Sequence, residues 1–279
     1  MTDRSDKARV NHAIVLRTER LTPHMIRVVL GGAGLADFHA GAFTDHYVKL
    51  IFPRPGVEYP VPLDMAAVRR ELPREQWPRL RSYTVRAWDA ARRELTIDFV
   101  YHGDEGLAGP WAAAARPGDE IMFLGPGGAY APGREADWHL LVGDESALPA
   151  IAASLERLPA GVPAQVFVEV AGPEEEQPLA TAAAAEIVWV HRGPRTVGAA
   201  LVEAVRALEF PPGAVQAFVH GEAAFVRQLR HLLRFDRGVA REQLSISGYW
   251  RLGTDDEGWR AIKADWNRRI EEEEVSLVA

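Results

Sequence analysis

The chain has 279 residues, of which 47% are hydrophobic and 25% are charged, and its formal net charge is −7. This composition excludes a disordered chain and leaves room for two globular domains of ordinary size. The negative charge argues against a nucleic-acid partner, and the absence of cysteine excludes disulfides, thiol catalysis and cysteine-held iron–sulfur clusters. No apolar signal segment opens the sequence and no run of about 18 apolar residues occurs, so we expect a cytoplasmic protein without membrane insertion.

The first half of the chain reads as short β-strands separated by glycine and proline. The expected strands are 10–20, 24–30, 46–52, 81–87, 94–100 and 119–124. Closely spaced strands with turn signals predict an antiparallel barrel or sandwich. The stretch 53–80 holds six prolines and many charges. It is too long for a plain turn, so we expect an excursion with a short helix near residues 64–70.

The pattern of expected elements changes after residues 125–133, where strands begin to alternate with helices. The expected strands are 138–143, 164–172, 186–193, 215–221 and 243–250, and the expected helices are 146–158, 196–209, 222–235 and 256–271. Alternating strands and helices predict a mostly parallel sheet of five strands. The sequence therefore predicts an antiparallel β-barrel domain over residues 1–133 and an α/β domain with a C-terminal helix over residues 134–279.

This order of domains suggests where ligands bind. Ligands of open α/β sheets bind at the carboxyl ends of the strands. A site between a barrel and such a sheet could hold two flat molecules face to face, an arrangement that suits electron transfer between cofactors.

The stretch "RSYTVR" (81–86) has an unusual alternation for a half-buried strand, because Arg81 and Tyr83 share one face. Such a pair can clamp one ligand, the guanidinium pairing with a phosphate and the ring stacking on a planar heterocycle. Thr84 faces the other way unless the strand is bent, and its hydroxyl could serve a ring nitrogen. On periodicity alone, an ordinary strand with a solvent-facing arginine remains an alternative.

A polar, glycine-rich turn and a short helix beginning near Pro110 follow the strand at 94–100. Proline with Trp111 behind it is a good helix start. Glycines at 103, 106 and 109 allow backbone to approach a ligand closely, and a helix N-terminus offers free N–H groups to a pyrophosphate.

The residues "RSYT" (81–84) resemble the Arg-x-Tyr-Ser/Thr flavin signature of the ferredoxin–NADP reductase superfamily. Further segments together resemble the siderophore-interacting protein family of flavin-dependent ferric-siderophore reductases. They are "DFVYHG…GPWA…PGDEIMFLGPGG" (98–128), "GDESALPAI" (143–151), "HGEAAFVRQLRHLL" (220–233), "GYWRLG" (248–253), "TPHMIRVVL" (22–30) and "DHYVKLIF" (45–52). The resemblance covers nearly the whole chain and depends on the order and spacing of these motifs.

The resemblance implies an N-terminal FAD-binding β-barrel and a C-terminal NAD(P)H-binding α/β domain. It places Arg81 at the flavin side of the diphosphate, Tyr83 at the flavin, and Thr84 near N5, where the hydride arrives. It implies that the face of Arg81 and Tyr83 lies towards a flavin rather than a hydrophobic core. The residues expected to hold the flavin and its diphosphate are Arg81, Ser82, Tyr83, Thr84, Asp98, Phe99, Val100, His102, Gly106, Leu107, Ala108, Gly109, Trp111 and Ala112.

The segment "GDESALPAI" sits at the end of the first strand of the α/β domain and lacks a GxGxxG motif. The residues expected at the nucleotide are Gly143, Asp144, Glu145, Ser146, Trp250 and Arg251. For Asp144 and Ser146 the alternative is helix N-capping, which needs no ligand. Trp250 and Arg251 would cover the flavin or nicotinamide pocket, or else pack at a domain interface.

The family places basic residues around a pocket for anionic ferric chelates, and Lys49 is the best match. With Thr84 it completes the expected catalytic residues, and no metal-ligating residues are expected. Gly127 stands where some relatives carry a basic residue, which weakens the case for a strongly cationic pocket. The basic residues that could compensate are His24, Arg192, Arg195 and Lys263, and for each of these plain solvent exposure is the alternative.

We therefore expect a monomeric FAD enzyme that reduces an Fe(III)-siderophore and releases Fe(II). A hydride carries two electrons and Fe(III) accepts one, so a flavin is needed between NADH or NADPH and iron. A reduced ferredoxin is another possible donor. The alternatives are another flavin or quinone reductase of the same superfamily, and a non-catalytic siderophore-binding protein.

Overall fold

The computed structural model describes residues 9–278, and by their contacts these residues form two compact units. The first, which we name the β unit, contains the described residues up to Pro132 together with Pro149–Pro159 and Glu174–Ala182. The second, the α/β unit, contains the remaining described residues. The domain boundary expected between residues 133 and 134 remains a prediction.

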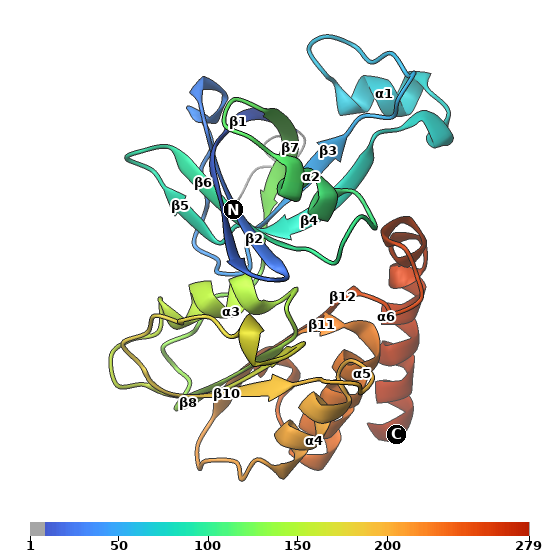
Figure 1. Cartoon of the computed structure of the whole chain (residues 1–279). Coiled ribbons are helices and arrows are strands. Elements are labelled where there is room, and N and C mark those ends of the chain that lie inside the picture. The colour runs from blue at the N-terminus through green and yellow to red at the C-terminus, as the bar shows by residue number, and fades with distance from the viewer. Residues whose placement is uncertain (1–8, 279) are drawn as a thin grey trace. The chain divides into compact units, whose positions relative to one another are not determined.

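The β unit is built on one sheet of seven strands, one more than expected, and their antiparallel pairing confirms the prediction (Figure 1). Its strands are β1 (Val10–Thr22), β2 (Met25–Gly31), β3 (Tyr47–Phe52), β4 (Arg79–Thr84), β5 (Ala87–Asp89), β6 (Glu94–Val100) and β7 (Glu120–Gly127). Their order in the sheet is β4-β3-β7-β1-β2-β6-β5. Two short helices accompany them, α1 (Met65–Glu71) in the proline-rich excursion and α2 (Ala108–Ala114) after β6.

A corner at Val85 and Arg86 divides the single strand expected over residues 81–87 into β4 and β5. The amide of Val85 donates to the carbonyl oxygen of His46 beside β3, over 2.6 Å. The next amide, that of Arg86, donates to the carbonyl oxygen of Thr96 on β6, over 2.9 Å. The chain thus passes from one edge of the sheet to the other within two residues. This corner directly joins the two edge strands β4 and β5, which do not pair with each other.

Alternate residues of these strands fill the core of the β unit. Its fully buried members include Val28, Leu30, Val48, Leu50, Leu95, Ile97, Phe99 and Phe123. The period of two is the one that the sequence shows for half-buried strands. At the excursion, Asp64 accepts hydrogen bonds from the amides of Ala66 and Ala67, which begins α1 close to its expected start.

Two later segments of the chain are tied into the β unit. Ser154 of α3 (Leu148–Leu155) donates to the hydroxyl of Thr44 over 2.8 Å. The buried carboxylate of Glu175 accepts from the hydroxyl of Thr22 over 2.5 Å and from the amide of His24 over 3.2 Å. All three hydrogen bonds join positions far apart in the sequence, so no local pattern predicts them.

The α/β unit contains the predicted parallel sheet of five strands. They are β8 (Trp138–Gly143), β9 (Pro163–Val170), β10 (Ala184–His191), β11 (Val215–Glu222) and β12 (Leu244–Trp250), in the order β10-β9-β8-β11-β12. All six residues of β8, the central strand, are buried, as expected for a parallel sheet covered on both faces.

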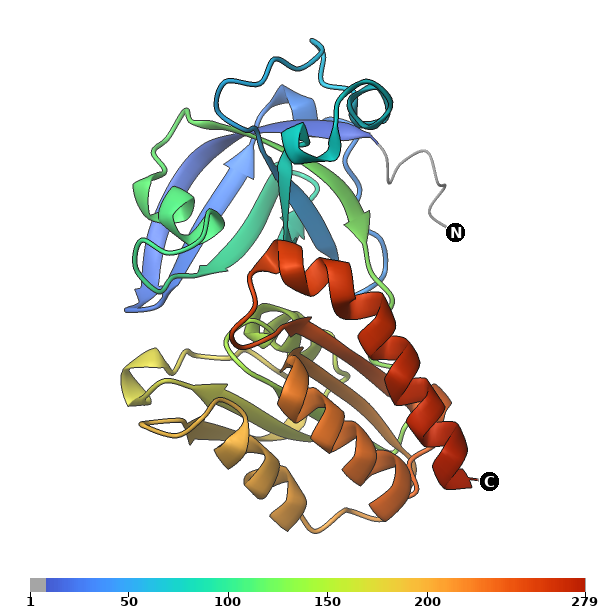
Figure 2. The ribbon, with the colours of Figure 1, turned by 90° about the vertical axis from the view of Figure 1, so that its right-hand side faces the viewer.

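Helices α4 (Ala199–Ala207) and α5 (Ala223–His231) pack on one face of this sheet (Figure 2). Helix α5 continues as a short π-helix over Leu232–Asp236, and α6 (Asp256–Val278) follows β12. No helix within residues 9–278 is both long enough and apolar enough to cross a membrane.

The strand order reverses between β8 and β11. The chain runs outward from β8 through β9 to β10, and then returns to place β11 on the other side of β8. In open α/β sheets the crevice outside the carboxyl ends of the strands at such a reversal is the usual ligand site. The residues that end β8 and β11 are therefore the first to examine.

Candidate functional site

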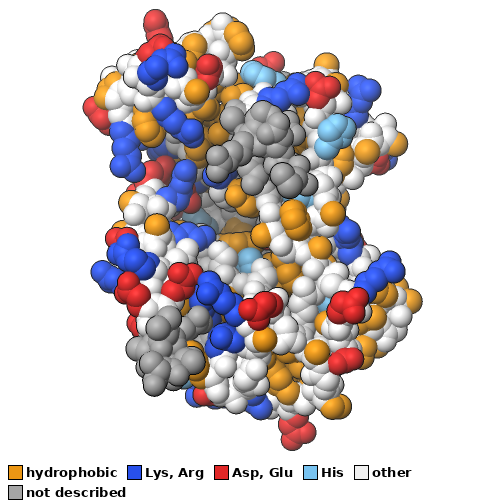
Figure 3. All heavy atoms as spheres, turned by 180° about the vertical axis from the view of Figure 1, so that it is seen from behind, with side chains coloured by type: hydrophobic (Ala, Val, Ile, Leu, Met, Phe, Trp, Pro, Cys, Tyr) orange, Lys and Arg blue, Asp and Glu red, His pale blue; other side chains and the backbone are white. Residues whose placement is uncertain are grey.

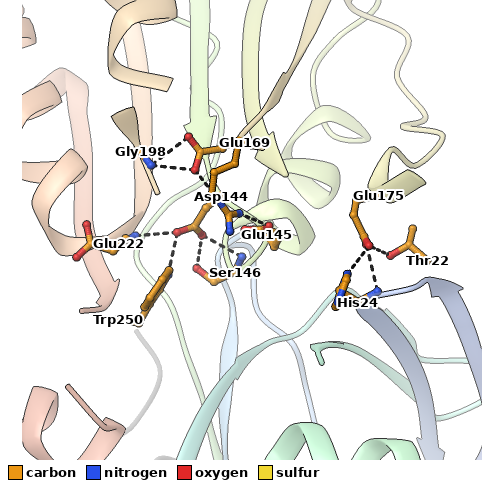
Figure 4. Close-up of polar contacts among 11 residues, drawn as sticks. Thr22, His24, Asp144, Glu145, Ser146, Glu169, Glu175, Gly198, Glu222 and Trp250 are labelled. Atoms are coloured by element: carbon orange, nitrogen blue, oxygen red, sulfur yellow. Dashed lines mark hydrogen bonds and ion pairs between the residues drawn. The ribbon is translucent and has the colours of Figure 1, made fainter. Parts of the chain in front are cut away.

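Asp144 follows β8 directly and its buried carboxylate joins three elements at the reversal of the sheet (Figure 4). It accepts from the amide and hydroxyl of Ser146 over 2.9 and 2.5 Å, and from the amide of Glu222 over 2.9 Å. The indole N–H of Trp250 completes the set over 2.8 Å. Burial raises the pKa of the Asp144 carboxyl, and these donors oppose that rise.

The hydrogen bonds of Asp144 bear on its two possible roles, helix N-capping and nucleotide binding. The bond to the Ser146 amide belongs to the turn before α3, as a capping role requires. The bonds to Glu222 and Trp250 cross to β11 and β12, which capping does not require. Trp250 is half-buried at the end of β12, whereas Arg251 after it is exposed.

A second cluster lies beside Asp144 at the ends of β8, β9 and β10 (Figure 4). The fully buried Glu169 accepts from the amide of Gly198 over 2.8 Å and from Nε of Arg192 over 3.0 Å. Another N–H of Arg192 donates to the carboxylate of Glu145. Burial and the neighbouring charge of Asp144 raise the pKa of Glu145 to about 7, against the opposing charge of Arg192.

In the β unit, the structure gathers the aromatic residues of the expected flavin site. The ring centroid of Tyr83 lies 4.5 Å from that of Phe99, and the ring of Phe99 lies 5.6 Å from that of Trp111. Tyr83 and Trp111 are partly exposed and Phe99 is buried in the core. The expectation that the face of Tyr83 turns away from the hydrophobic core is wrong, because its ring packs partly against that core.

The pairing of β3 with β4 explains this position. Arg81 lies opposite Leu50 and Tyr83 lies opposite Val48. Directly opposite residues of an antiparallel pair share a face, and both Leu50 and Val48 are fully buried in the core. Arg81 therefore stands on the core-facing side of β4, where it is half-buried.

The two expected catalytic residues share the other face of β3 and β4. Lys49 lies opposite Ser82, and Thr84 lies opposite Tyr47. Thr84 is buried, whereas Lys49 is half-buried and its Nζ lies 5.9 Å from the centre of the Tyr47 ring. The opposite facing of Thr84 and Tyr83, expected from alternation, is what the register shows.

The Asp98 side chain lies apart from the aromatic cluster. Arg27 donates to both its carboxylate oxygens, over 2.7 and 2.8 Å, and Nε of Arg86 lies 3.9 Å from Oδ2. Because Asp98 precedes Phe99 on β6, its side chain points to the opposite face. A contact of Asp98 with a ligand at the cluster would therefore come from its backbone.

A cavity of about 600 Å³ lies on that opposite face of the β unit. Its lining includes Arg17, Glu19, Arg27, Arg86, Thr96 and Glu156. None of the expected site residues lines it. Its three arginines are each paired with a carboxylate, those of Glu94, Asp98 and Glu156.

Backbone conformation and packing account for two glycines of the turn after β6. Gly106 has a φ of +82°, a backbone conformation that other residues rarely adopt. A Cβ on Gly109 would lie 3.1 Å from the carbonyl oxygen of Val100, so this glycine lets α2 approach β6. The remaining expected residues here are buried at Ala108 and Ala112, half-buried at Val100 and Leu107, and exposed at His102.

Four basic residues were named as possible replacements for a basic residue at position 127, and the structure gives each of them a partner. Arg192 is in the cluster described above, and Arg195 pairs with Glu203 over 2.5 Å. His24 pairs with Glu175 over 2.5 Å, and Nζ of Lys263 donates to the hydroxyl of Ser247 over 3.1 Å. On the face that Figure 3 shows, basic and acidic side chains are interspersed rather than gathered by sign.

Two site residues, Glu169 and Glu222, were not expected from the sequence, and Arg192 was singled out only as a basic residue without a place. Glu169 is the penultimate residue of β9, Glu222 ends β11 and Arg192 directly follows β10. Polar residues at the carboxyl ends of predicted parallel strands are the signal that would have found all three. Within residues 9–278, no group of three or more His, Asp or Glu side chains is placed to hold a metal ion.

Two family models match the chain. The model of the siderophore-interacting FAD-binding domain matches residues 14–130, and the model of the siderophore-interacting protein matches residues 136–253.

Relatives match over most of their length. An uncharacterised protein of Mycobacterium tuberculosis is 47% identical over 94% of this chain and 95% of its own. The ferric vibriobactin reductase ViuB of Vibrio cholerae is 33% identical over 88% of this chain and 90% of that protein. The NADPH-dependent ferric-chelate reductase of Escherichia coli is 32% identical over 87% of this chain and 93% of that protein.

Solved structures of siderophore-related proteins are also similar to this chain. A siderophore utilization protein from T. fusca superposes with a TM-score of 0.77 at 38% identity, covering 89% of this chain and 95% of that one. The siderophore-interacting protein SipS from Aeromonas hydrophila gives 0.78 at 30% identity, with 92% and 98% covered. A ferredoxin NADP+ reductase from Neisseria gonorrhoeae gives 0.59 at 14% identity, with 87% and 100% covered, which shows the fold alone.

Proposed function

Because this chain belongs to the siderophore-interacting protein family, we propose that it is an FAD-dependent enzyme that uses NADH or NADPH to reduce Fe(III) held by a siderophore. The observation that carries the proposal is its match to two named ferric reductases over 87–88% of the chain. A family-model match alone would leave the chemistry open, because one fold hosts many functions.

The FAD-binding residues would come from residues 1–133. Their chemistry fits the group: Arg81 offers a cation for the diphosphate, the partly exposed rings of Tyr83 and Trp111 offer faces for stacking, and Thr84 offers a hydroxyl. When bound, FAD supplies the conversion of a two-electron hydride into single electrons. The chain's own residues would bind and orient it, and the hydroxyl of Thr84 is buried away from water.

The donor nucleotide would bind residues 134–279 at the carboxyl edge of the parallel sheet. Asp144 joins the ends of β8, β11 and β12 there, so Gly143, Ser146 and Trp250 are held in fixed positions around it. We propose that this fixed edge orients the nicotinamide end of NADH or NADPH. A reduced ferredoxin remains the alternative donor.

The substrate would be an anionic ferric chelate attracted by Lys49. This cation stands on the same face of the sheet as Thr84, and the net charge of −7 would otherwise repel such a substrate. Two chelates take the two electrons of one hydride in turn. Fe(II), with its lower charge, binds hard oxygen donors less tightly and leaves the chelate.

The test begins with the purified protein and its absorption spectrum. We expect a yellow protein with two absorption bands in the blue and near-ultraviolet. Under anaerobic conditions, NADH or NADPH should bleach it, and a ferric siderophore should restore the colour while a chromogenic Fe(II) chelator reports iron release. A protein that binds the chelate but holds no flavin would instead be a siderophore-binding protein.

The choice of acceptor separates the remaining alternative. A general flavin or quinone reductase would turn over free flavins and quinones at least as well as ferric chelates. We expect the ferric chelate to give the higher kcat/KM. We also propose that the protein acts in the cytoplasm as a monomer, which cell fractionation and sedimentation can test.

A further inference from the structure

Arg192 bridges the ends of two neighbouring strands of the parallel sheet. It follows β10, yet its guanidinium donates to Glu169 on β9 and to Glu145 beyond the end of β8. The side chains of Arg192 and Glu145 are 22% and 14% exposed, whereas Glu169 is fully buried. The ion pair of Arg192 with Glu145 therefore forms the solvent-facing side of this cluster.

The three carboxylates around Arg192 are held very differently. Asp144 accepts bonds from Ser146, Glu222 and Trp250, and Glu169 accepts two from the amide of Gly198. Among the residues that the structure describes, the carboxylate of Glu145 interacts favourably with its own amide and with Arg192 alone. Glu145 is thus the carboxylate that depends most on the guanidinium.

The remaining charged groups nearby have other partners. Glu222 accepts from the amide of Ala224 at the start of α5, and Arg195 pairs with Glu203. The charges that face Glu145 are those of Asp144, Glu169 and Arg192. Of these three charges, that of Arg192 alone favours the ionised form of Glu145.

We propose that Glu145 is an internal counter-ion of Arg192 that takes up a proton from solvent when a phosphate of the donor dinucleotide binds this guanidinium. This inference rests on the proposed function, which places the dinucleotide at the same edge of the sheet. A phosphate that shares Arg192 withdraws the one favourable charge beside Glu145 and adds a negative charge. Protonation then removes the repulsion from Asp144 and Glu169 and avoids an unpaired buried anion.

The consequence is a donor affinity that depends on pH. Burial and Asp144 raise the pKa of Glu145 to about 7 in the free protein, and loss of Arg192 raises it further. Below this value the carboxyl already carries its proton, so affinity is constant. Above it each binding event must draw a proton from solvent, and the association constant falls about tenfold between pH 6 and pH 8.

The test is calorimetric titration of the flavin-loaded protein with NAD+ and with NADP+, which bind without turnover. Titrations at pH 7.5 in two buffers of different ionisation enthalpy count the protons taken up. We expect roughly three-quarters of a proton per nucleotide bound, the ionised fraction of a group with a pKa of about 7.

The variant Glu145→Gln should take up no proton through this site and should lose the fall in affinity between pH 6 and pH 8. The 2′-phosphate of NADP+ titrates near pH 6 but does so equally in both proteins, so the difference between them isolates Glu145. The control Glu203→Gln removes a carboxylate from the other arginine and should match the wild type.

The outcomes separate the two proposals. Nucleotide binding without proton uptake, or equal uptake by wild type and Glu145→Gln, would overturn the role of Glu145 while leaving the proposed function standing. No binding of either nucleotide by the wild type would overturn both. The proton count on the wild type decides the matter even if the variant folds poorly.

Discussion

The ring of Tyr47 occupies the space into which a side chain on Gly127 would project. A Cβ on Gly127 would lie 2.6 Å from Cζ of Tyr47, closer than such atoms approach in proteins. The two residues pair across β3 and β7, and the Tyr47 ring is itself only 5.9 Å from Nζ of Lys49. The absence of a basic residue at position 127 is therefore tied to the presence of tyrosine at position 47.

A double-mutant cycle tests whether Tyr47 and Gly127 are energetically coupled. Gly127→Ala should destabilise the protein by about 1 kcal/mol, the lower end for overpacking, because the half-exposed Tyr47 ring must swing aside. In a Tyr47→Ala background the same change should cost almost nothing. Chemical denaturation of the two single variants and the double variant measures the coupling, and additive costs would show that the ring and the glycine are independent.

Arg81→Ala should weaken the retention of FAD more than it perturbs the fold. Loss of a charge-assisted phosphate contact should cost about 1.5–3 kcal/mol of binding. The measurement is the dissociation constant for FAD after removal and re-addition of the flavin, with Arg92→Ala as a control on an exposed arginine of the same unit. Full flavin content and unchanged affinity in the variant would remove Arg81 from the site.

Lys49→Ala should raise the KM for an anionic ferric chelate at low salt, and should do so less at high salt. Attraction by a partly exposed cation is screened over about 8–10 Å. A cationic chelate should be affected little, and flavin reduction by the nicotinamide donor should be unchanged in stopped-flow measurements. Equal losses for both chelates would exclude an electrostatic role, and slower flavin reduction would assign Lys49 to the donor site.

Glu145 should also make the stability of the ligand-free protein depend on pH. Its folded pKa of about 7 lies above the 4.5 of an ordinary glutamate, so its contribution is fully present below pH 4.5 and is lost as pH rises through 7. That loss amounts to about 2–3 kcal/mol for a mostly buried carboxyl. Unfolding free energies of wild type and Glu145→Gln at pH 5 and pH 8 measure it. We expect the wild type to fall more steeply by this amount, and parallel pH profiles would refute the shift.

Strand and helix positions were largely predictable because they follow from local periodicity. The five parallel strands and the helix at residues 64–70 lie within a few residues of their expected bounds. The corner at Val85 and Arg86 was not predictable, because the residues on either side are all compatible with a strand. Only the distant partners His46 and Thr96 reveal where the chain changes edge.

In the candidate site, too, the position of a residue was predictable from local sequence but its side-chain partners were not. Asp144 was expected from its position after a predicted strand, but its bonds to Glu222 and Trp250 depend on the strand order, which one sequence does not give. The ion pair of Asp98 with Arg27 depends on the register of β2 with β6. Side-chain partners across a sheet are set by pairing between distant segments, so they lie beyond the reach of local pattern.

The corner at Val85 and Arg86 would link the supply of cofactor to the lifetime of the protein. The strand that carries Arg81 and Tyr83, the residues proposed to hold the flavin, ends at this corner, so bound flavin would favour the folded arrangement of the two edge strands. A ligand that binds only the folded form stabilises it by mass action. Copies made while flavin is scarce should open more often at this corner and be degraded sooner, so the cell's flavin level would set the amount of this protein as well as its activity.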